Sequence, residues 1–150
     1  MKKVKYFIVG GGIAGTTAAE TIRQYDKSGL IAVVSDEPYS LYSRVMLSKH
    51  EFYSSEGENK IWLKTPEWYI KENIDFFSGR KAVNLDANKK IIRLDNGEEI
   101  EYEKLLIATG SCARKWAISG SGKKGVFSLR VLDDAKAIKE KIKTAKKVVA

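Results

Sequence analysis

Residues that bind metals or form disulfides are almost missing from this sequence. Among its 150 residues, Cys112 is the single cysteine and His50 the single histidine. One thiol cannot form an intramolecular disulfide, a cysteine zinc site or a CxxC redox pair, and one imidazole argues against a histidine-based metal centre. We therefore predict no metal site, and we treat Cys112 as an ordinary small residue.

Long apolar runs and blocks of charge are missing as well. The longest apolar run is about five residues, far short of the about 20 that a membrane-spanning helix needs, and the N-terminus lacks the apolar core of a signal peptide. The net charge is +8, but the lysines and arginines are scattered, which is typical of a solvated surface rather than a nucleic-acid-binding face. The sequence predicts a cytoplasmic protein that contacts neither membrane nor nucleic acid.

The order of apolar runs and turn residues predicts an α/β fold. A strand at 6–9, a glycine-rich turn, a helix at 13–22 and a second apolar strand at 30–37 together form a βαβ unit. The continuous apolar character of the second strand favours a parallel sheet covered on both faces. We also expect a long connection over 38–59 with one helical turn near Met46, and a helix that begins at Pro66 with Thr65 as its cap. The expected strands are one at 74–79, two or three short ones over 81–102 with a turn at Asn96-Gly97, a buried one at 104–110 and a short one at 126–130. A helix is expected at 133–144.

Three glycines, Gly10, Gly12 and Gly15, have the Gly-x-Gly-x-x-Gly spacing between the first strand and the first helix. The first glycine of such a turn permits a tight bend, the second lets the backbone approach a pyrophosphate, and the third lets the helix pack on the strand. The acidic pair Asp36-Glu37 lies about twenty residues further on, where a carboxylate can bind ribose hydroxyls. No Gly-Lys-Ser/Thr follows, which excludes a Walker-type loop. The pattern predicts a dinucleotide site without separating NAD from FAD.

A later segment favours FAD, because the glycine-ended strand LLIATG follows an inserted hairpin rather than uninterrupted βα repeats. The chain contains, in this order, GGGIAG, EPYSLYSRVMLSK, NGEEIEYEKLLIATGS and GVFSLRVLDDAKAIKEKI. Together these segments resemble the N-terminal FAD-binding part of the pyridine nucleotide-disulfide oxidoreductase superfamily over nearly the whole chain. The branch it resembles most contains ferredoxin and rubredoxin reductases, NADH oxidases and the reductase part of the nitrite reductase large subunit. The resemblance implies a Rossmann-like FAD-binding domain, with a parallel sheet and an inserted antiparallel hairpin or meander.

The resemblance also assigns the binding of FAD to particular residues. It implies that the FAD pyrophosphate is held at Gly10, Gly12, Ala14 and Gly15. The ribose carboxylate falls on Asp36, with its neighbour Glu37 as the alternative.

Further residues are implied to contact the rest of the cofactor. Arg44 would lie near the phosphates, and Lys49 beside the flavin ring would be the catalytic residue. A guanidinium can bind phosphate oxygens bidentately, and an ammonium stabilises the negative charge that develops on a reduced flavin. The alternative for each is a solvated surface side chain. The other implied contacts are the backbone of Ala82 at the adenine, Thr109 and Gly110 against the cofactor, and Arg130 on the flavin side.

The sequence departs from the family where a redox cysteine would stand. Val45 occupies the position at which the peroxidase and coenzyme A disulfide branches have a cysteine, and no CxxxxC pair is present. Electrons would then leave the flavin directly, for oxygen or for a rubredoxin- or ferredoxin-like protein. The loop SCARKWAISG also lacks the prolines usual in the family, which leaves its path open.

The same resemblance predicts a truncated protein. We expect an FAD-binding domain at 1–114, a connecting loop, strand and helix at 115–146, and the start of a missing NAD(P)-binding domain at 147–150. The predicted function is that of the FAD-binding part of an NAD(P)H-dependent flavin oxidoreductase, inactive without the missing NAD(P)H site. The alternatives are an NAD-binding dehydrogenase domain, which the inserted hairpin argues against, and a non-catalytic nucleotide-binding or protein-interaction module.

Overall fold

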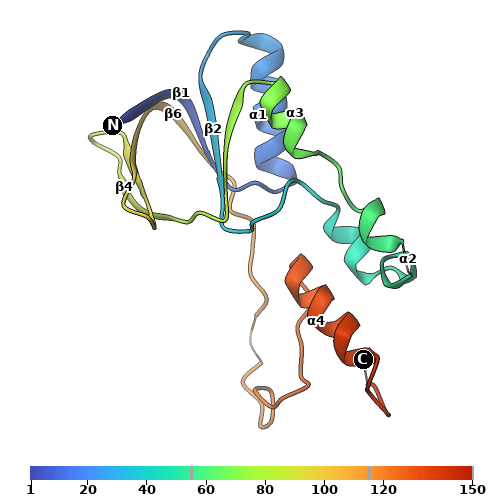
Figure 1. Ribbon diagram of the computed structural model, residues 1–150. Coiled ribbons are helices and arrows are strands. Elements are labelled where there is room, and N and C mark those ends of the chain that lie inside the picture. The colour runs from blue at the N-terminus through green and yellow to red at the C-terminus, as the bar shows by residue number, and fades with distance from the viewer. Residues whose placement is uncertain (55, 115, 150) are drawn as a thin grey trace. The chain divides into compact units, whose positions relative to one another are not determined.

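The computed structural model describes residues 1–54, 56–114 and 116–149 (Figure 1). The strands are β1 (Lys2–Val9), β2 (Ile31–Ser35), β3 (Ile74–Ser78), β4 (Ala82–Asp86), β5 (Ile91–Leu94) and β6 (Glu99–Ile107). The α-helices are α1 (Ile13–Tyr25), α2 (His50–Tyr53), α3 (Pro66–Lys71) and α4 (Leu132–Ile142), and the 3-10 helices are η1 (Arg44–Ser48) and η2 (Gly57–Lys60). The described residues divide into a first unit, 1–42 with 62–110, and a second unit drawn from 43–61 and 111–150.

The first unit is built on a six-stranded sheet with the strand order β3-β2-β1-β6-β5-β4. β1 pairs in parallel with both β2 and β6, and β2 pairs in parallel with β3. The pairs β4–β5 and β5–β6 are antiparallel. The predicted α/β fold, a parallel sheet with an inserted antiparallel meander, is confirmed.

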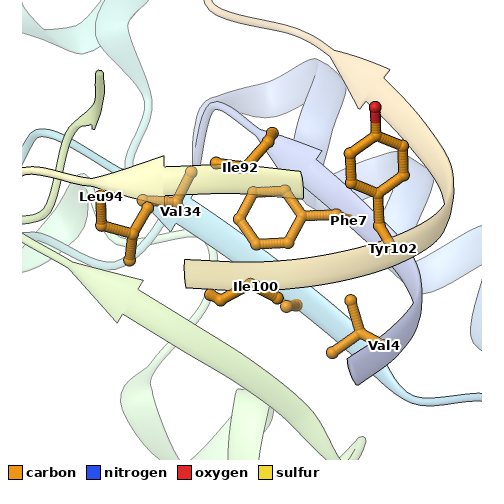
Figure 2. Packing of buried hydrophobic residues seen from close by; sticks show 8 residues of the cluster. Val4, Phe7, Val34, Ile92, Leu94, Ile100 and Tyr102 are labelled. Atoms are coloured by element: carbon orange, nitrogen blue, oxygen red, sulfur yellow. The ribbon is translucent and has the colours of Figure 1, made fainter. Parts of the chain in front are cut away.

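The core lies on both faces of the sheet, because successive side chains of a strand point to opposite sides. Phe7 of β1 and Val34 of β2 pack on one face against meander residues such as Ile92, and Figure 2 shows Phe7 within this cluster. Ile8 of β1 packs on the other face against Ala19 of α1, together with residues of β2, β3 and α3. The helices α1 and α3 thus cover one face, and the meander covers the other (Figure 1).

Three expected elements differ from the structure. The segment 104–110 is not a separate buried strand: residues 104–107 are the last part of β6, where Leu106 and Ile107 are 39% and 61% exposed, and residues 108–110 are irregular. Residues 126–130 are irregular, because the described residues provide no partner strand for them, and a strand requires one. The connection over 38–59 holds η1, α2 and η2 rather than one helical turn. Lys115 and Ala150, which the expected domain division places in the connecting segment and in the last segment, lie outside the described residues, and the division at 114/115 and 146/147 stays a prediction.

The start of α3 is only partly as expected. Pro66 is the first helical residue and Thr65 occupies the cap position, but the Thr65 side chain makes no capping bond to the helix backbone. Its hydroxyl instead donates to Glu67 and lowers the pKa of that carboxyl.

Asp26 joins the end of α1 to β1. Its Oδ1 accepts hydrogen bonds from the backbone N–H groups of Ser28 and Gly29 at 3.1 and 2.7 Å. Its Oδ2 accepts from Lys5 Nζ at 2.7 Å and from the Tyr6 hydroxyl at 3.0 Å. The Lys5 ammonium, helped by the N–H of Gly29, holds the pKa of the Asp26 carboxyl well below its usual range.

We predict that Asp26→Asn lowers the stability of the chain at neutral pH and flattens its acid dependence. A carboxyl whose pKa is lowered by folding contributes stability above its unfolded pKa, about 3.9, and this contribution is lost as the pH falls toward the folded value. Urea unfolding followed by circular dichroism at pH 7 and pH 3 measures the difference. Asp95→Asn is the control, because Asp95 is exposed and its carboxylate has no hydrogen bond within the described residues. Equal losses for both variants at pH 7 would contradict the prediction.

Candidate functional site

The turn between β1 and α1 brings backbone atoms too close for side chains at two of its glycines. Gly10 has a φ of +120°, and a Cβ there would lie 2.2 Å from the carbonyl oxygen of Ala108. A Cβ on Gly15, in the first turn of α1, would lie 1.9 Å from the carbonyl oxygen of Gly10. Both glycines are therefore required by the packing of α1 and β6 around the end of β1.

Gly12 is different, because nothing in its surroundings requires a glycine. Its φ is −76°, which any residue adopts, and within the described residues no heavy atom lies within 4 Å of a Cβ built there. Gly12 is also the cap residue of α1 and has no side-chain cap bond. Within the described part of the chain, the N–H groups of Ile13 and Ala14 at the start of α1 have no hydrogen-bond acceptor, and both residues are exposed. Open space beside free helix N–H groups fits a phosphate that the backbone approaches closely.

A cavity of about 190 Å³ lies at the carboxyl ends of β1 and β2. It is smaller than the roughly 300 Å³ or more of most ligand pockets, so it fits one part of a dinucleotide. The end of a parallel strand pair is where such ligands bind in open α/β sheets. The lining residues are Val9, Gly10, Val34, Asp36, Arg80, Lys81, Ala82 and Thr109.

The structure separates the two acidic candidates. The carboxylate of Asp36 lines the cavity, and the described residues offer it neither a hydrogen bond nor an ion pair. The carboxylate of Glu37 instead accepts a hydrogen bond from the hydroxyl of Tyr42. The Asp36 carboxylate is therefore available to ribose hydroxyls, whereas the Glu37 carboxylate already accepts a hydrogen bond within the protein.

Two cavity residues, Arg80 and Lys81, were not identified from the sequence. They lie in the segment that crosses from β3 at one edge of the sheet to β4 at the other. The N–H of Arg80 donates to the Ser35 carbonyl at 2.9 Å, and the N–H of Gly79 donates to the Glu37 carbonyl at 3.1 Å. The only sequence signal is a basic pair between two strands, and its position over the cavity depends on the strand order. The crossing brings the basic residues Arg80 and Lys81 to the cavity, and Ala82 lines it at the start of β4.

Thr109 and Gly110 follow the end of β6. The N–H of Ala108 donates to the carbonyl of Val9 at 2.7 Å, which fixes this end beside β1. Thr109 lines the cavity, and Gly110 has a φ of +71°. A positive φ favours glycine there whether or not a cofactor is bound.

The other three candidates belong to the second unit. Arg44 begins η1, and its Nη1 donates to the carbonyl of Arg130 at 3.3 Å. Arg130 Nε donates to the carbonyl of Ser111 at 3.0 Å. Lys49 lies between η1 and α2, and it is exposed. The structure brings Arg44 and Arg130 together, and the flavin-side roles of these two residues and Lys49 stay predictions.

Comparison with known proteins gives a family match and close relatives. The model of the family described as pyridine nucleotide-disulphide oxidoreductase matches residues 4–150. Rubredoxin-NAD(+) reductase of Pseudomonas putida is 39% identical over 142 residues, which cover 95% of this chain and 37% of the relative. The ferredoxin–NAD(+) reductase component of the biphenyl dioxygenase system of Paraburkholderia xenovorans is 33% identical, covering 95% of this chain and 35% of the relative.

A solved structure agrees with these relatives. The crystal structure of NADH:rubredoxin oxidoreductase from Clostridium acetobutylicum matches with a TM-score of 0.81 and 36% identity, over 95% of this chain and 36% of that one. The chain thus spans little more than a third of the length of the relatives that it matches.

We predict that Gly12→Ala weakens the binding of an ADP-containing cofactor such as FAD without destabilising the chain. The methyl group would occupy the open space that the phosphate needs. The backbone conformation at this position tolerates alanine, which raises the free energy of unfolding by up to about 1 kcal/mol because the unfolded chain has less conformational freedom. Gly15→Ala should instead lower the stability of the chain, because its Cβ would collide with the carbonyl oxygen of Gly10. Gly122→Ala is the matched control, since its Cβ also meets nothing within 4 Å. Urea unfolding and flavin fluorescence titration measure both quantities, and full FAD affinity in Gly12→Ala would refute the assignment.

We also predict that Asp36→Ala weakens FAD binding about tenfold or more, because each lost charge-assisted hydrogen bond to ribose contributes about 1.5–3 kcal/mol. Glu37→Ala should have a smaller effect, since its carboxylate is bonded to Tyr42. Isothermal titration of FAD into each variant makes the comparison. A larger loss at Glu37 than at Asp36 would show that the ribose carboxylate is misassigned.

Proposed function

Because the chain belongs to the pyridine nucleotide-disulphide oxidoreductase family, we propose that it binds FAD as part of an NAD(P)H-dependent flavin oxidoreductase. Reductases of this family use FAD and NAD(P)H. The observation that carries the proposal is the cavity that joins Gly10, Asp36, Ala82 and Thr109, four residues selected from the sequence alone. It lies at the same end of β1 as the open space around Gly12.

The residues of the first unit fit the ADP half of FAD. The N–H groups at the start of α1 would donate to the pyrophosphate, and the partial positive charge of the helix end adds to their effect. Asp36 would accept the ribose hydroxyl protons, and the backbone of Ala82 would meet the adenine. Arg80 and Lys81 would supply positive charge beside this half of the cofactor.

The residues of the second unit would serve the flavin half. FAD, when bound, accepts a hydride from NAD(P)H and passes the electrons on. Lys49 would stabilise negative charge on the ring, and Arg44 would pair with phosphate. Arg130 would hold Arg44 in place through its backbone carbonyl and act on the flavin side itself.

The acceptor that we propose is a small redox protein of the rubredoxin or ferredoxin kind. The names of the relatives carry this proposal, and the sequence supports it, because Val45 replaces the cysteine that would take electrons within the protein. Oxygen, as in an NADH oxidase, and the partner centre of a nitrite reductase are the alternative acceptors. The cytoplasmic location expected from the sequence stays a proposal; among the described residues no helix is long and apolar enough to cross a membrane.

We predict that the chain binds FAD more tightly than NAD. Both ligands contain ADP, but the order of the four family-like segments favours FAD as the ligand of the ADP site. Calorimetric titration of the 150-residue chain with FAD, NAD and ADP measures the three affinities, and a yellow colour that co-elutes with the chain on gel filtration gives a second readout. Tighter binding of NAD would favour a dehydrogenase domain. Binding of none of the three would favour a protein-interaction module.

A further inference from the structure

Behind the glycine turn, four residues from different parts of the first unit form a closed set of contacts. Gly11 is buried, and a Cβ there would lie 3.1 Å from the ring of Phe76 in β3. Phe76 stacks on Tyr69 of α3, with ring centroids 4.2 Å apart and planes 8° from parallel. Tyr69 Oη lies 3.3 Å from Thr16 Oγ1 of α1, and Thr16 Oγ1 donates to the carbonyl oxygen of Gly11 at 3.2 Å.

The direction of these hydrogen bonds follows from the number of protons. A hydroxyl has one proton to donate, and Thr16 donates its proton to Gly11. Tyr69 is therefore the donor to Thr16. The backbone N–H of Leu41 donates in turn to the Tyr69 oxygen, and burial raises the pKa of Tyr69, which keeps this proton in place. The bonds run in one direction from Leu41 to Gly11, and such chains strengthen one another.

The last bond of this series fixes the orientation of one peptide group. In a planar trans peptide the N–H lies on the edge opposite the C=O, so a held Gly11 carbonyl directs the N–H of Gly12 the other way. No described residue provides a backbone acceptor for that N–H. Without the bond the peptide could rotate readily, because glycines on both sides impose little steric restriction.

We propose that Thr16 and Tyr69 are positioning residues, which hold the Gly11–Gly12 peptide with its N–H directed at the phosphate of the bound dinucleotide. The identity of that ligand rests on the proposed function; the orientation of the peptide does not. Neither side chain needs to touch the ligand. Thr16 is fully buried and Tyr69 is 2% exposed, so both act through the backbone of the turn.

Isosteric substitutions separate positioning from packing. Thr16→Val keeps the shape but removes the donor to Gly11, and Tyr69→Phe keeps the stacking on Phe76 but removes the donor to Thr16. Thr16→Ser keeps the hydroxyl and loses a methyl group, so it should lower stability while preserving the orientation. The controls are Thr17→Val, the exposed neighbour on α1, and Tyr102→Phe, a buried tyrosine in the cluster of Figure 2.

The first measurement needs no ligand. In ¹⁵N-labelled chain we expect the Gly12 amide signal to shift or broaden in Thr16→Val and Tyr69→Phe. The signal should stay near its original position in Thr16→Ser and in both controls. An unchanged Gly12 signal in Thr16→Val would overturn the proposal.

The second measurement is FAD affinity, set beside urea unfolding for every variant. We expect about tenfold weaker FAD binding in Thr16→Val, a smaller loss in Tyr69→Phe, and less than about twofold in Thr16→Ser and the controls. Equal losses in Thr16→Ser and Thr16→Val would show a packing effect and refute the positioning role. A parent chain that binds no FAD would refute the proposed function, and the Gly12 amide would then decide the peptide orientation by itself.

Discussion

The candidate site at the carboxyl end of β1 depends on a contact between backbones that leaves no room for a side chain. α1 can approach β1 only because Gly15 presents no Cβ to the carbonyl of Gly10, and Gly10 in turn lies against the carbonyl of Ala108 after β6. Two strands and one helix thus meet at this point. This packing helps to place the N-terminus of α1, with its first N–H groups, at the end of β1. Gly12 takes no part in it, and the space beside Gly12 stays open.

The sheet order places the rest of the site. β3 and β4 lie at opposite edges of the sheet, yet only residues 79–81 connect them. The connection can be this short because the meander packs over one face of the parallel strands, where Ile92 and Leu94 contact Val34 of β2. Hydrogen bonds from Gly79 and Arg80 to the segment 35–37 fasten this crossing to the end of β2. The crossing becomes one wall of the cavity, and the end of β2 supplies Asp36 to it. Asp36, Arg80 and Lys81 therefore line the same cavity through topology, although Asp36 is far from the other two in sequence.

Features set by local geometry could be predicted from the sequence. The glycine turn, the α1 helix and the hairpin at Asn96-Gly97, where Gly97 has a φ of +85°, each depend on a few neighbouring residues. The wrong strand at 126–130 had suitable residues, but a strand also needs a partner. The sequence favoured Asp36 over Glu37 as the ribose carboxylate only through the resemblance, and the hydrogen bond from Tyr42 to Glu37, which supports this preference, could not be predicted from local pattern.

Contacts over long sequence separations were beyond local pattern. Thr16 and Tyr69 are 53 positions apart, and nothing in either surrounding segment indicates that their hydroxyls meet. The same is true of Arg80 and Lys81, which acquire a place at the cavity only when β4 pairs at the far edge of the sheet. The sequence therefore indicated which backbone approaches the ligand, whereas the structure adds the side chains that hold that backbone and line the cavity.

Polar groups are paired very differently at the two ends of β1. At its amino end, the buried guanidinium of Arg23 donates to the carbonyls of Glu72, Asn73, Asp26 and Gly29 at 2.7–3.0 Å, and the Asp26 carboxylate accepts four further bonds. At its carboxyl end, Asp36, Arg80 and Lys81 have no side-chain partners among the described residues. Exposed polar groups cost little while water solvates them, whereas unpaired buried groups cost much more. The hydrogen-bond network at the amino end of β1 can therefore be complete while the carboxyl end keeps polar groups available to a ligand. The residues that stabilise the fold are in this way different from those that would bind the cofactor.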